Sequence, residues 1–232
     1  MEFTTQLIKG TFIKRYKRFF VDAKLENGET IVAHCPNTGS MKGLIIEGAP
    51  VYLTPNSDPK RKLKYTFEMI DTGTSLVGVN TSLPNKIVEE GVEKDLIPAL
   101  LGYSNIRREV KYGENSRIDL LLESEGKPKC YVEVKNTTLA EGKTALFPDS
   151  VTSRGTKHLL ELAEMVKQGH RSVMVFLCNR ADCEEFSVAD EIDKVYGETF
   201  RSVLKEGVEA VCMKVRISPN EIIIDKEIPI KV

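Results

Sequence analysis

The sequence lacks the features that mark several classes of protein. Its five cysteines are an odd number with no C-x-x-C pair, so we expect neither a disulfide framework nor a zinc site. The longest apolar run, Val173–Cys178, is far too short to cross a bilayer. The first ten residues have no charged leader followed by an apolar run, so no signal peptide is expected. These absences favour a protein of the reducing cytoplasm. Three of the cysteines lie in apolar runs and are expected to be buried thiols: Cys130, Cys178 and Cys212.

Net charge is also nearly absent. The chain has 33 Lys and Arg against 34 Asp and Glu, which argues against a global electrostatic attraction to any partner. The charge is unevenly distributed, because residues 1–83 hold 11 basic against 8 acidic residues and the remainder holds 22 against 26. A basic front half suits contact with a phosphate backbone, and an acidic back half suits a metal ion. The difference is small and carries little weight by itself.

The first 80 or so residues are typical of short strands between turns. Asn27-Gly28 is a good hairpin turn, and five or so short strands in this length suit a small barrel or sandwich. The expected strands are Lys9–Tyr16, Phe19–Leu25, Thr30–Ala33, Pro50–Thr54, Lys64–Ile70 and Ser75–Val79. The pattern changes near Leu83-Pro84, so we place a domain boundary there, with domains at residues 1–83 and 84–232.

The second domain alternates between helices and strands, which predicts a compact α/β core. We find no internal repeat or low-complexity tract. The expected helices are Asn85–Leu101, Ser153–Lys167 and Glu191–Lys205, and the expected strands are Arg107–Tyr112, Ser116–Glu123, Lys129–Asn136, Ser172–Cys178, Val208–Ile217 and Glu221–Ile224.

Two of these strands carry charged residues in unusual places. In C-Y-V-E-V-K-N (130–136), strict alternation puts Tyr131, Glu133 and Lys135 on one face. In the preceding strand, Asp119 lies among apolar residues, where a carboxylate is costly unless it has a partner. A hairpin through residues 123–128 would bring Asp119 opposite Glu133. The alternative is an ordinary network of ion pairs on a solvated sheet face.

Two facing carboxylates repel each other unless a cation lies between them. Mg²⁺, or Mn²⁺ in its place, suits such a site, because it is held by one or two carboxylates together with water and substrate oxygens. The ion would polarise a phosphate and lower the pKa of a bound water molecule. Lys135 would orient that water or stabilise the developing charge. The sequence therefore predicts metal-assisted hydrolysis of a phosphodiester at Asp119, Glu133 and Lys135.

Three further segments are candidates for contacts with nucleic acid. Around a helix start within residues 145–162, the side chains of Arg154, Lys157 and His158 share one side, although a merely solvated polar face is the alternative. The turn-rich segment H-C-P-N-T-G-S-M (34–41) offers Asn37, Thr38, Gly39 and Ser40 to an anion, or is an ordinary tight turn. Residues 12–20 interleave aromatic rings with basic side chains, as a nucleic-acid-binding barrel does, although many of these rings must also build the core of the small domain. These basic residues are Lys14, Arg15, Lys17 and Arg18.

The pattern D-x₁₃-E-x-K, on consecutive strands after a helix, resembles the PD-(D/E)xK superfamily of restriction and repair nucleases. Ile118 stands where the superfamily name places proline. Such enzymes often carry another acid on the preceding helix, and Glu90 is our choice over Glu89 and Glu93. The metal set implied at this site is Asp119, Glu133 and Val134.

Four motifs in order indicate a narrower resemblance. The segments H-C-P-N-T-G-S-M, S-R-I-D, E-V-K-N and F-P-D-S-V-T-x-R-G-x-K-H-L are similar to those of the sugar fermentation stimulation protein A (SfsA) family. The resemblance implies a small all-β OB-like barrel, followed by a restriction-endonuclease-like domain with a mixed sheet flanked by helices. It also implies binding to DNA and a link to the regulation of sugar metabolism.

Three functions are compatible with these observations. The leading hypothesis is a DNA-binding protein with a Mg²⁺-dependent nuclease site. The second is a DNA-binding regulator that keeps the nuclease fold without the chemistry, and the third is an enzyme that acts on a nucleotide or short oligonucleotide. The sequence leaves open DNA against RNA, the strand preference and whether the protein is a homodimer. It shows no helix suited to reading the major groove.

Overall fold

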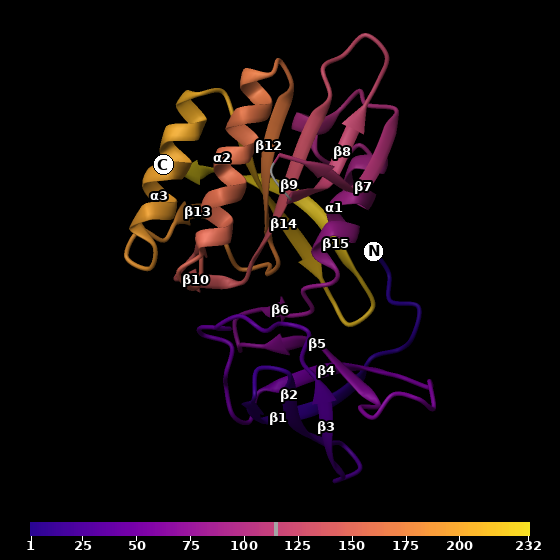
Figure 1. The fold of residues 1–232 in the computed structure, drawn as a ribbon. Helices are drawn as coiled ribbons and strands as arrows, with labels where there is room; N and C mark the ends of the chain where they lie inside the picture. Colours follow the sequence, from indigo (N-terminus) through magenta and orange to yellow (C-terminus); the bar gives the residue numbers. More distant parts are fainter. Residues whose placement is uncertain (114–115) are drawn as a thin grey trace.

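The protein forms two halves that lie one above the other (Figure 1). The structure is a computed structural model and describes residues 1–113 and 116–232. The N-terminal half is built from strands alone, whereas the C-terminal half is a sheet with helices on both faces. No helix in the described part of the chain is long and apolar enough to span a membrane.

The N-terminal half is a closed barrel. Its strands follow the order β3-β2-β1-β4-β5-β6, and an additional pairing of β3 with β5 closes five of them into a ring. This arrangement is an OB-like barrel, as the family resemblance implied. The strands are β1 (Ile8–Tyr16), β2 (Phe20–Leu25), β3 (Thr30–His34), β4 (Pro50–Pro55), β5 (Tyr65–Asp71) and β6 (Leu76–Gly78). All six strands expected from the sequence are therefore present.

The barrel has a core of its own because apolar residues alternate along its strands. Val21, Ala23 and Leu25 of β2 point inward with Phe12, Val51 and Phe67 from the other strands. The turn at Asn27-Gly28 joins β2 to β3 as expected, and Gly28 adopts a φ of 88°, which glycine accepts without strain. The ring of Phe12 is fully enclosed, so it supports the barrel and does not contact a ligand.

The C-terminal half is built on a six-stranded mixed sheet of order β15-β14-β12-β9-β8-β7. The central strands β9, β12 and β14 run parallel, and the outer strands β7, β8 and β15 run antiparallel to their neighbours. The bounds are β7 (Asn105–Tyr112), β8 (Ser116–Glu123), β9 (Cys130–Thr137), β12 (Arg171–Cys178), β14 (Glu209–Ile217) and β15 (Ile222–Ile228).

Helices cover both faces of this sheet (Figure 1). Helix α1 (Pro84–Glu93) packs on one face against β8, β9 and β15, and helices α2 (Ser153–Lys167) and α3 (Lys194–Lys205) pack on the other. Two separate apolar clusters result, one on each face. Cys130, Cys178 and Cys212 lie buried in these clusters, which confirms the expectation for these three thiols.

Two helices begin or end differently from the expectation. Helix α1 stops at Glu93, because Asp95 adopts a φ of 56° and Pro98, which has no N–H, begins a separate 3₁₀ turn over Pro98–Leu100. Helix α3 begins at Lys194 instead of Glu191, because the side chain of Asp193 caps it by accepting a hydrogen bond from Tyr196 N–H at 3.0 Å.

A second, smaller sheet was not expected from the sequence. Its order is β10-β11-β13-β16, and β11 and β13 pair in parallel although 37 residues separate their ends. Strands of two to four residues carry too little alternation to be recognised from sequence. The bounds are β10 (Leu139–Glu141), β11 (Thr144–Phe147), β13 (Glu185–Val188) and β16 (Ile230–Lys231).

The chain passes between the halves twice. Phe3 N–H donates to the carbonyl of Asn220 at 2.9 Å, so the first residues pair with the C-terminal half before the chain enters the barrel. The chain returns to the C-terminal half after β6. Near that point an isolated antiparallel β-bridge pairs Val77 of the barrel with Arg180 of the C-terminal half. The domain boundary at Leu83-Pro84 stays a prediction, and the start of α1 at Pro84 is consistent with it.

Candidate active site

The candidate site lies where strands β8 and β9 separate. The last paired residues of the two strands are Leu120 and Val132, and Asp119 and Glu133 each lie one residue beyond this pair. The carboxylates of Asp119 and Glu133 are therefore brought to the same place at the end of a hydrogen-bonded ladder. Lys135 follows two residues later on the same face of β9 as Glu133.

Asp119 is held from two sides. Its Oδ1 accepts a hydrogen bond from Asn85 Nδ2 of helix α1 at 2.8 Å, and its Oδ2 accepts one from the backbone N–H of Val134 at 2.7 Å. Burial, together with the nearby charge of Glu133, raises the pKa of Asp119 to about 6, although the two hydrogen bonds oppose this rise. Asp119 thus changes charge close to neutral pH.

Glu133 is almost completely buried and has two donors on one oxygen. Lys135 Nζ donates to Glu133 Oε1 at 2.7 Å, and His158 Nδ1 contacts the same oxygen. The other oxygen, Oε2, is buried and has no hydrogen-bond partner among the described residues. Burial disfavours the charged form of Glu133, but the bonds from His158 and Lys135 outweigh it and hold the pKa below its usual range.

This donor set fits a hard divalent cation. A buried carboxylate oxygen without a partner is costly unless an ion or water binds it, and the carboxyl group of Asp119 is nearby. Among the described residues there is no group of three His, Cys, Asp or Glu side chains that would hold a metal on their own. An ion here would therefore depend on two carboxylates together with water and substrate oxygens, as Mg²⁺ does.

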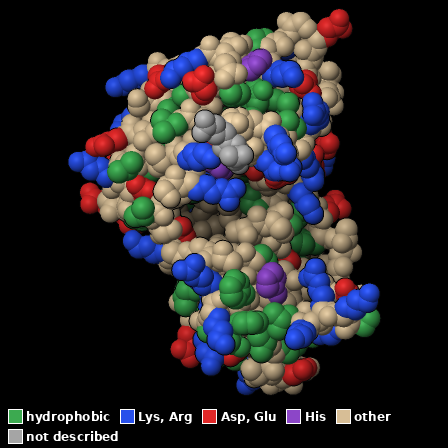
Figure 2. All heavy atoms as spheres, viewed as in Figure 1, with side chains coloured by type: hydrophobic (Ala, Val, Ile, Leu, Met, Phe, Trp, Pro, Cys, Tyr) green, Lys and Arg blue, Asp and Glu red, His purple; other side chains and the backbone are tan. Residues whose placement is uncertain are grey.

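The cavity in front of these groups has a volume of about 660 Å³. Lys and Arg side chains border the hollow between the two halves of the molecule (Figure 2). A polyanion would therefore meet positive charge at the entrance and carboxylates at the base. The cavity is lined by the linker residue Thr81, by Asn85 of α1, by Arg117 and Asp119 of β8, by Glu133, Val134 and Lys135 of β9, and by Arg154, Lys157 and His158 of α2, among others.

Helix α2 brings its three predicted residues to this cavity. Thr152 caps the helix by accepting a hydrogen bond from Gly155 N–H at 3.1 Å. Arg154 and Lys157 are exposed at the wall of the cavity. His158, in contrast, is buried and contacts Glu133 instead of being free to bind a phosphate.

The structure does not bring Glu90 to this group. Its Oε1 accepts a hydrogen bond from Lys94 Nζ at 2.5 Å, and its Oε2 pairs with the N-terminal ammonium group at 3.0 Å. The reason is the rotation of helix α1, in which each residue advances the side chain by about 100°. Asn85 faces Asp119, and Glu90 consequently faces β15 and the chain start, so the helix contributes an amide to the site instead of an acid.

The loop at residues 34–41 makes contacts within the protein. The guanidinium group of Arg15 donates to the carbonyl oxygens of Asn37 at 2.8 Å and Gly39 at 2.9 Å. Asn37 Oδ1 accepts a hydrogen bond from Gly39 N–H, and Ser40 bonds to Asp149 of the other half. Arg15, Asn37, Gly39 and Ser40 therefore have structural partners. Thr38 is exposed, and its side chain makes no hydrogen bond with the described residues. The role of Arg15 and of these four loop residues toward nucleic acid stays a prediction.

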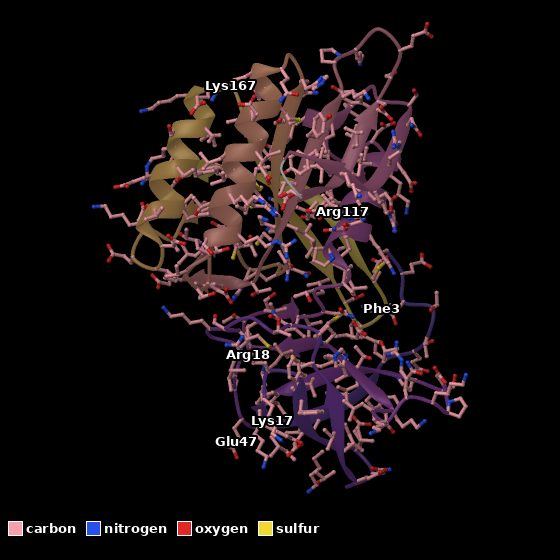
Figure 3. The ribbon with its side chains drawn as sticks, viewed as in Figure 1. Phe3, Lys17, Arg18, Glu47, Arg117 and Lys167 are labelled. Carbon is pink, nitrogen blue, oxygen red and sulfur yellow. The ribbon has the colours of Figure 1, made fainter. Side chains whose placement is uncertain are left out.

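The remaining basic candidates lie on the barrel surface. Lys17 and Arg18 form the turn between β1 and β2, with φ values of 47° and 65°, and are exposed (Figure 3). Lys14 pairs with Asp22 at 3.5 Å. Phe19, beside this turn, exposes 48% of its surface. These side chains are accessible to a ligand, and their contact with nucleic acid remains a prediction.

Among the cavity residues that sequence reasoning missed, Asn85 and Arg117 bear most directly on the site. The side-chain amide of Asn85, at the start of α1, donates a hydrogen bond to Asp119. Arg117 precedes Ile118-Asp119 and lies exposed at the cavity wall, labelled in Figure 3. The alternation of β8 places Arg117 on the same face as Asp119, which is a signal that would have identified it.

Two family models match the chain. Residues 82–221 match a model described as the sugar fermentation stimulation protein RE domain, and residues 13–79 match one described as the SfsA N-terminal OB domain. These matches agree with the closed barrel and with the mixed sheet flanked by helices. The expected fold, an OB-like barrel followed by a restriction-endonuclease-like domain, is confirmed.

Relatives match over almost their whole length. A sugar fermentation stimulation protein homolog of Paramagnetospirillum magneticum is 51% identical over 222 residues, which cover 96% of this chain and 94% of the relative. The homolog of Geobacter sulfurreducens is 49% identical over 224 residues, covering 97% and 96%. The structure of Pyrococcus furiosus SfsA in complex with Ca²⁺ superposes with a TM-score of 0.89 at 28% identity, covering 100% of this chain and 98% of that chain.

Proposed function

This chain belongs to the sugar fermentation stimulation protein family, and we propose that it is a metal-dependent nuclease that hydrolyses phosphodiester bonds in DNA. One observation carries the proposal. The buried Oε2 of Glu133, without a partner among the described residues, lies in the same cavity as Asp119 and Lys135. Two carboxylates and an ammonium group at the base of a cavity bordered by basic residues suit cleavage of a polyanion better than its simple binding.

The metal would be held by Asp119 and Glu133, with the backbone of Val134 as the third proposed contact. The relative from Pyrococcus furiosus was solved in complex with Ca²⁺, which supports a divalent cation in this family. We propose Mg²⁺ or Mn²⁺ as the ion for catalysis, because carboxylate and water ligands suit both. When bound, the ion would polarise the phosphate and lower the pKa of a water molecule.

The side chains around the site would divide the remaining tasks. Lys135 Nζ is 2.7 Å from Glu133 Oε1, so it would lie beside the scissile phosphate and stabilise the negative charge that develops there. Arg117, Arg154 and Lys157 at the cavity wall would hold the flanking phosphates. The barrel, with Lys14, Lys17 and Arg18 on its surface, would bind the strand as it leaves the cavity.

A paired cleavage assay tests the proposal. Labelled single- and double-stranded DNA and RNA are incubated with the wild type, Glu133→Gln and Glu90→Gln, in the presence of Mg²⁺, Mn²⁺ or EDTA. Glu90→Gln is the matched control, because Glu90 is a glutamate of the same domain that lies away from the cavity. We expect metal-dependent cleavage by the wild type and the control, and none by Glu133→Gln.

The rival functions have distinct outcomes in the same assay. Salt-dependent binding of DNA without cleavage under any metal would indicate a regulator that keeps only the fold. Turnover of nucleotides or short oligonucleotides, without activity on long DNA, would indicate the third function. The family name provides the link to sugar metabolism, which we retain as a proposed regulatory context.

A further inference from the structure

His158 has a place in the site that a contact with nucleic acid does not explain. The side chain is 7% exposed and projects from α2 toward β9, where Nδ1 contacts Glu133 Oε1. The other ring nitrogen, Nε2, accepts a hydrogen bond from Arg154 Nε at 3.3 Å. Both ring nitrogens of His158 are therefore engaged inside the protein.

Lys135 Nζ also lies 3.4 Å from Nδ1, but it donates to Glu133 Oε1 at 2.7 Å, so the bonds to Arg154 and Glu133 determine the tautomer of the ring. Because the guanidinium group of Arg154 has only donors, Nε2 of His158 must accept and cannot carry the proton. The proton of the neutral imidazole is then on Nδ1, which donates it to Glu133 Oε1. The chain Arg154–His158–Glu133 thus consists of two directed hydrogen bonds that end on a carboxylate oxygen.

As a result, the two carboxylate oxygens of Glu133 differ in their hydrogen bonds. Lys135 and His158 both donate to Oε1, whereas Oε2 has no partner among the described residues. Rotation of the carboxylate about its last side-chain bond would break both bonds. The two donors therefore fix one oxygen and leave the other for an external ligand.

We propose that His158 is a positioning residue that holds Glu133 Oε1 so that Oε2 is presented to a divalent cation, with Arg154 setting the tautomer of the ring. This inference rests on the metal site of the proposed function and adds to it a residue outside the Asp119, Glu133 and Lys135 set. Residues that hydrogen-bond a metal ligand and orient it in this way typically contribute ten- to hundredfold to metal affinity.

A neutral donor suits this position better than another cation would. Lys135 already places one positive charge on Glu133 Oε1, and a second ammonium group there would repel an incoming divalent ion. A neutral imidazole supplies a directed hydrogen bond without adding charge. Its orientation depends on α2, whose Leu159 and Leu162 are fully buried in the core.

Gly155 allows α2 to reach this position. A Cβ atom at residue 155 would lie 3.1 Å from the Tyr196 ring of α3 and 2.9 Å from the side chain of Thr152. Glycine thus permits a close approach of the two helices, and the capping residue Thr152 fixes the start of α2. The helix that carries His158 is consequently held by α3 and by its cap, and an orienting residue requires such a rigid support.

The decisive comparison is between two amides at residue 158. In His158→Asn the side-chain nitrogen takes the place of Nδ1 and keeps the bond to Glu133, whereas in His158→Gln the amide reaches the place of Nε2. His158→Leu removes both bonds. We would measure the affinity for Mn²⁺ and Ca²⁺ by calorimetry in the absence of nucleic acid, and the thermal midpoint of each variant.

We expect the Asn variant to bind the cation within about threefold of the wild type, and the Gln and Leu variants to bind roughly ten- to hundredfold more weakly. Equal affinity in all four proteins would overturn the proposal. So would an Asn variant as weak as Gln when both have the thermal midpoint of the wild type, or a wild type that binds no divalent cation.

A spectroscopic measurement tests the tautomer directly. The chain has only three histidines, so ¹⁵N-labelled histidine in the metal-free protein allows the signal of His158 to be assigned by its absence from His158→Asn. We expect a proton on Nδ1 in the wild type and a mixture of tautomers in Arg154→Met. A proton on Nε2 in the wild type would contradict the inference.

Failure of the inference and failure of the proposed function are distinguishable. If the wild type binds the cation and shows the difference between Asn and Gln, but cleaves no nucleic acid, the nuclease proposal fails and the role of His158 remains. If the wild type cleaves DNA and all variants at residue 158 bind and cleave equally, the nuclease proposal remains and the role of His158 fails.

Discussion

Ser40 of the barrel donates a hydrogen bond of 2.7 Å to Asp149 of the C-terminal half, across a separation of 109 residues. The backbone N–H of Met41 donates to the same carboxylate oxygen at 3.2 Å. Two motifs that each suggested a ligand site therefore bind to each other, and Asp149 joins the barrel to the segment that leads into α2. The contact fixes the barrel next to the cavity that α2 lines.

Removing this contact should weaken the attachment between the halves. We expect Asp149→Ala to lower the free energy of unfolding by about 1–2 kcal/mol, because one carboxylate accepts two hydrogen bonds there. Ser40→Ala should cost less, since the bond from Met41 remains. Urea unfolding would measure both changes, with Glu26→Ala on an exposed position of the barrel as the control. If Glu26→Ala lowered the free energy of unfolding as much as Asp149→Ala, the contact at Asp149 would have no specific role in joining the halves.

The pKa of Asp119 predicts how stability depends on pH in the absence of metal. The folded state has a pKa of about 6 against 3.8 for the free group, so between pH 4 and 6 the folded state binds more protons than the unfolded state. The free energy of unfolding should therefore fall by roughly 3 kcal/mol at most as the pH rises through this window. Above the window it should stay constant. Thermal midpoints of the wild type and Asp119→Asn measure this, and the fall should be absent in the variant.

The same group predicts the pH dependence of metal binding. A proton on Asp119 competes with a cation, so the affinity for Mn²⁺ should rise by about tenfold per pH unit below pH 6 and become flat above it. Glu133, whose pKa lies below its usual range, is already charged in this window. Calorimetric titrations between pH 5 and 8 would show this profile. An affinity that does not change between pH 5 and 6 would show that Asp119 is not a ligand.

Asn85 should contribute to the site through Asp119. Its amide donates to Asp119 Oδ1 at 2.8 Å, so we expect Asn85→Ala to lower the affinity for Mn²⁺ by roughly tenfold and to leave the fold intact. Lys86→Ala, one residue later on the exposed side of α1, is the control. If both variants bind the cation as the wild type does, Asn85 only supports the packing of α1.

Arg117 should contribute to the binding of DNA through phosphate contact. We expect Arg117→Ala to weaken binding and to reduce the slope of log affinity against log salt concentration by about 1, as for one lost phosphate contact. Arg216→Ala removes an exposed arginine that pairs with Glu221 and lies outside the cavity, so it should leave the slope unchanged. Fluorescence anisotropy with Ca²⁺ in place of Mg²⁺ would measure binding, and an equal change in both variants would contradict a local contact.

Much of the site was predictable because its pattern is local. The alternation of C-Y-V-E-V-K-N placed Glu133 and Lys135 on one face of a strand, and a hairpin to the preceding strand brought Asp119 close to them. The six barrel strands were equally predictable from alternation and turn residues. The short strands β10, β11, β13 and β16 were not, because β10 and β11 form a hairpin too short to show alternation, and the pairings of β13 with β11 and β16 join segments far apart in the chain.

The sequence by itself determined which residues share a face of a helix or strand, because this depends only on the periods of 3.6 and 2 residues. Tertiary packing decided which faces meet. It turned Asn85 toward Asp119 and Glu90 toward the N-terminus, and it buried His158 against Glu133 while leaving Arg154 and Lys157 at the cavity wall. The rotation of each helix about its axis is set by how its side chains pack into the apolar cluster on its face of the sheet. These clusters are formed by segments far apart in the chain, so the periodicity of one segment does not predict the rotation.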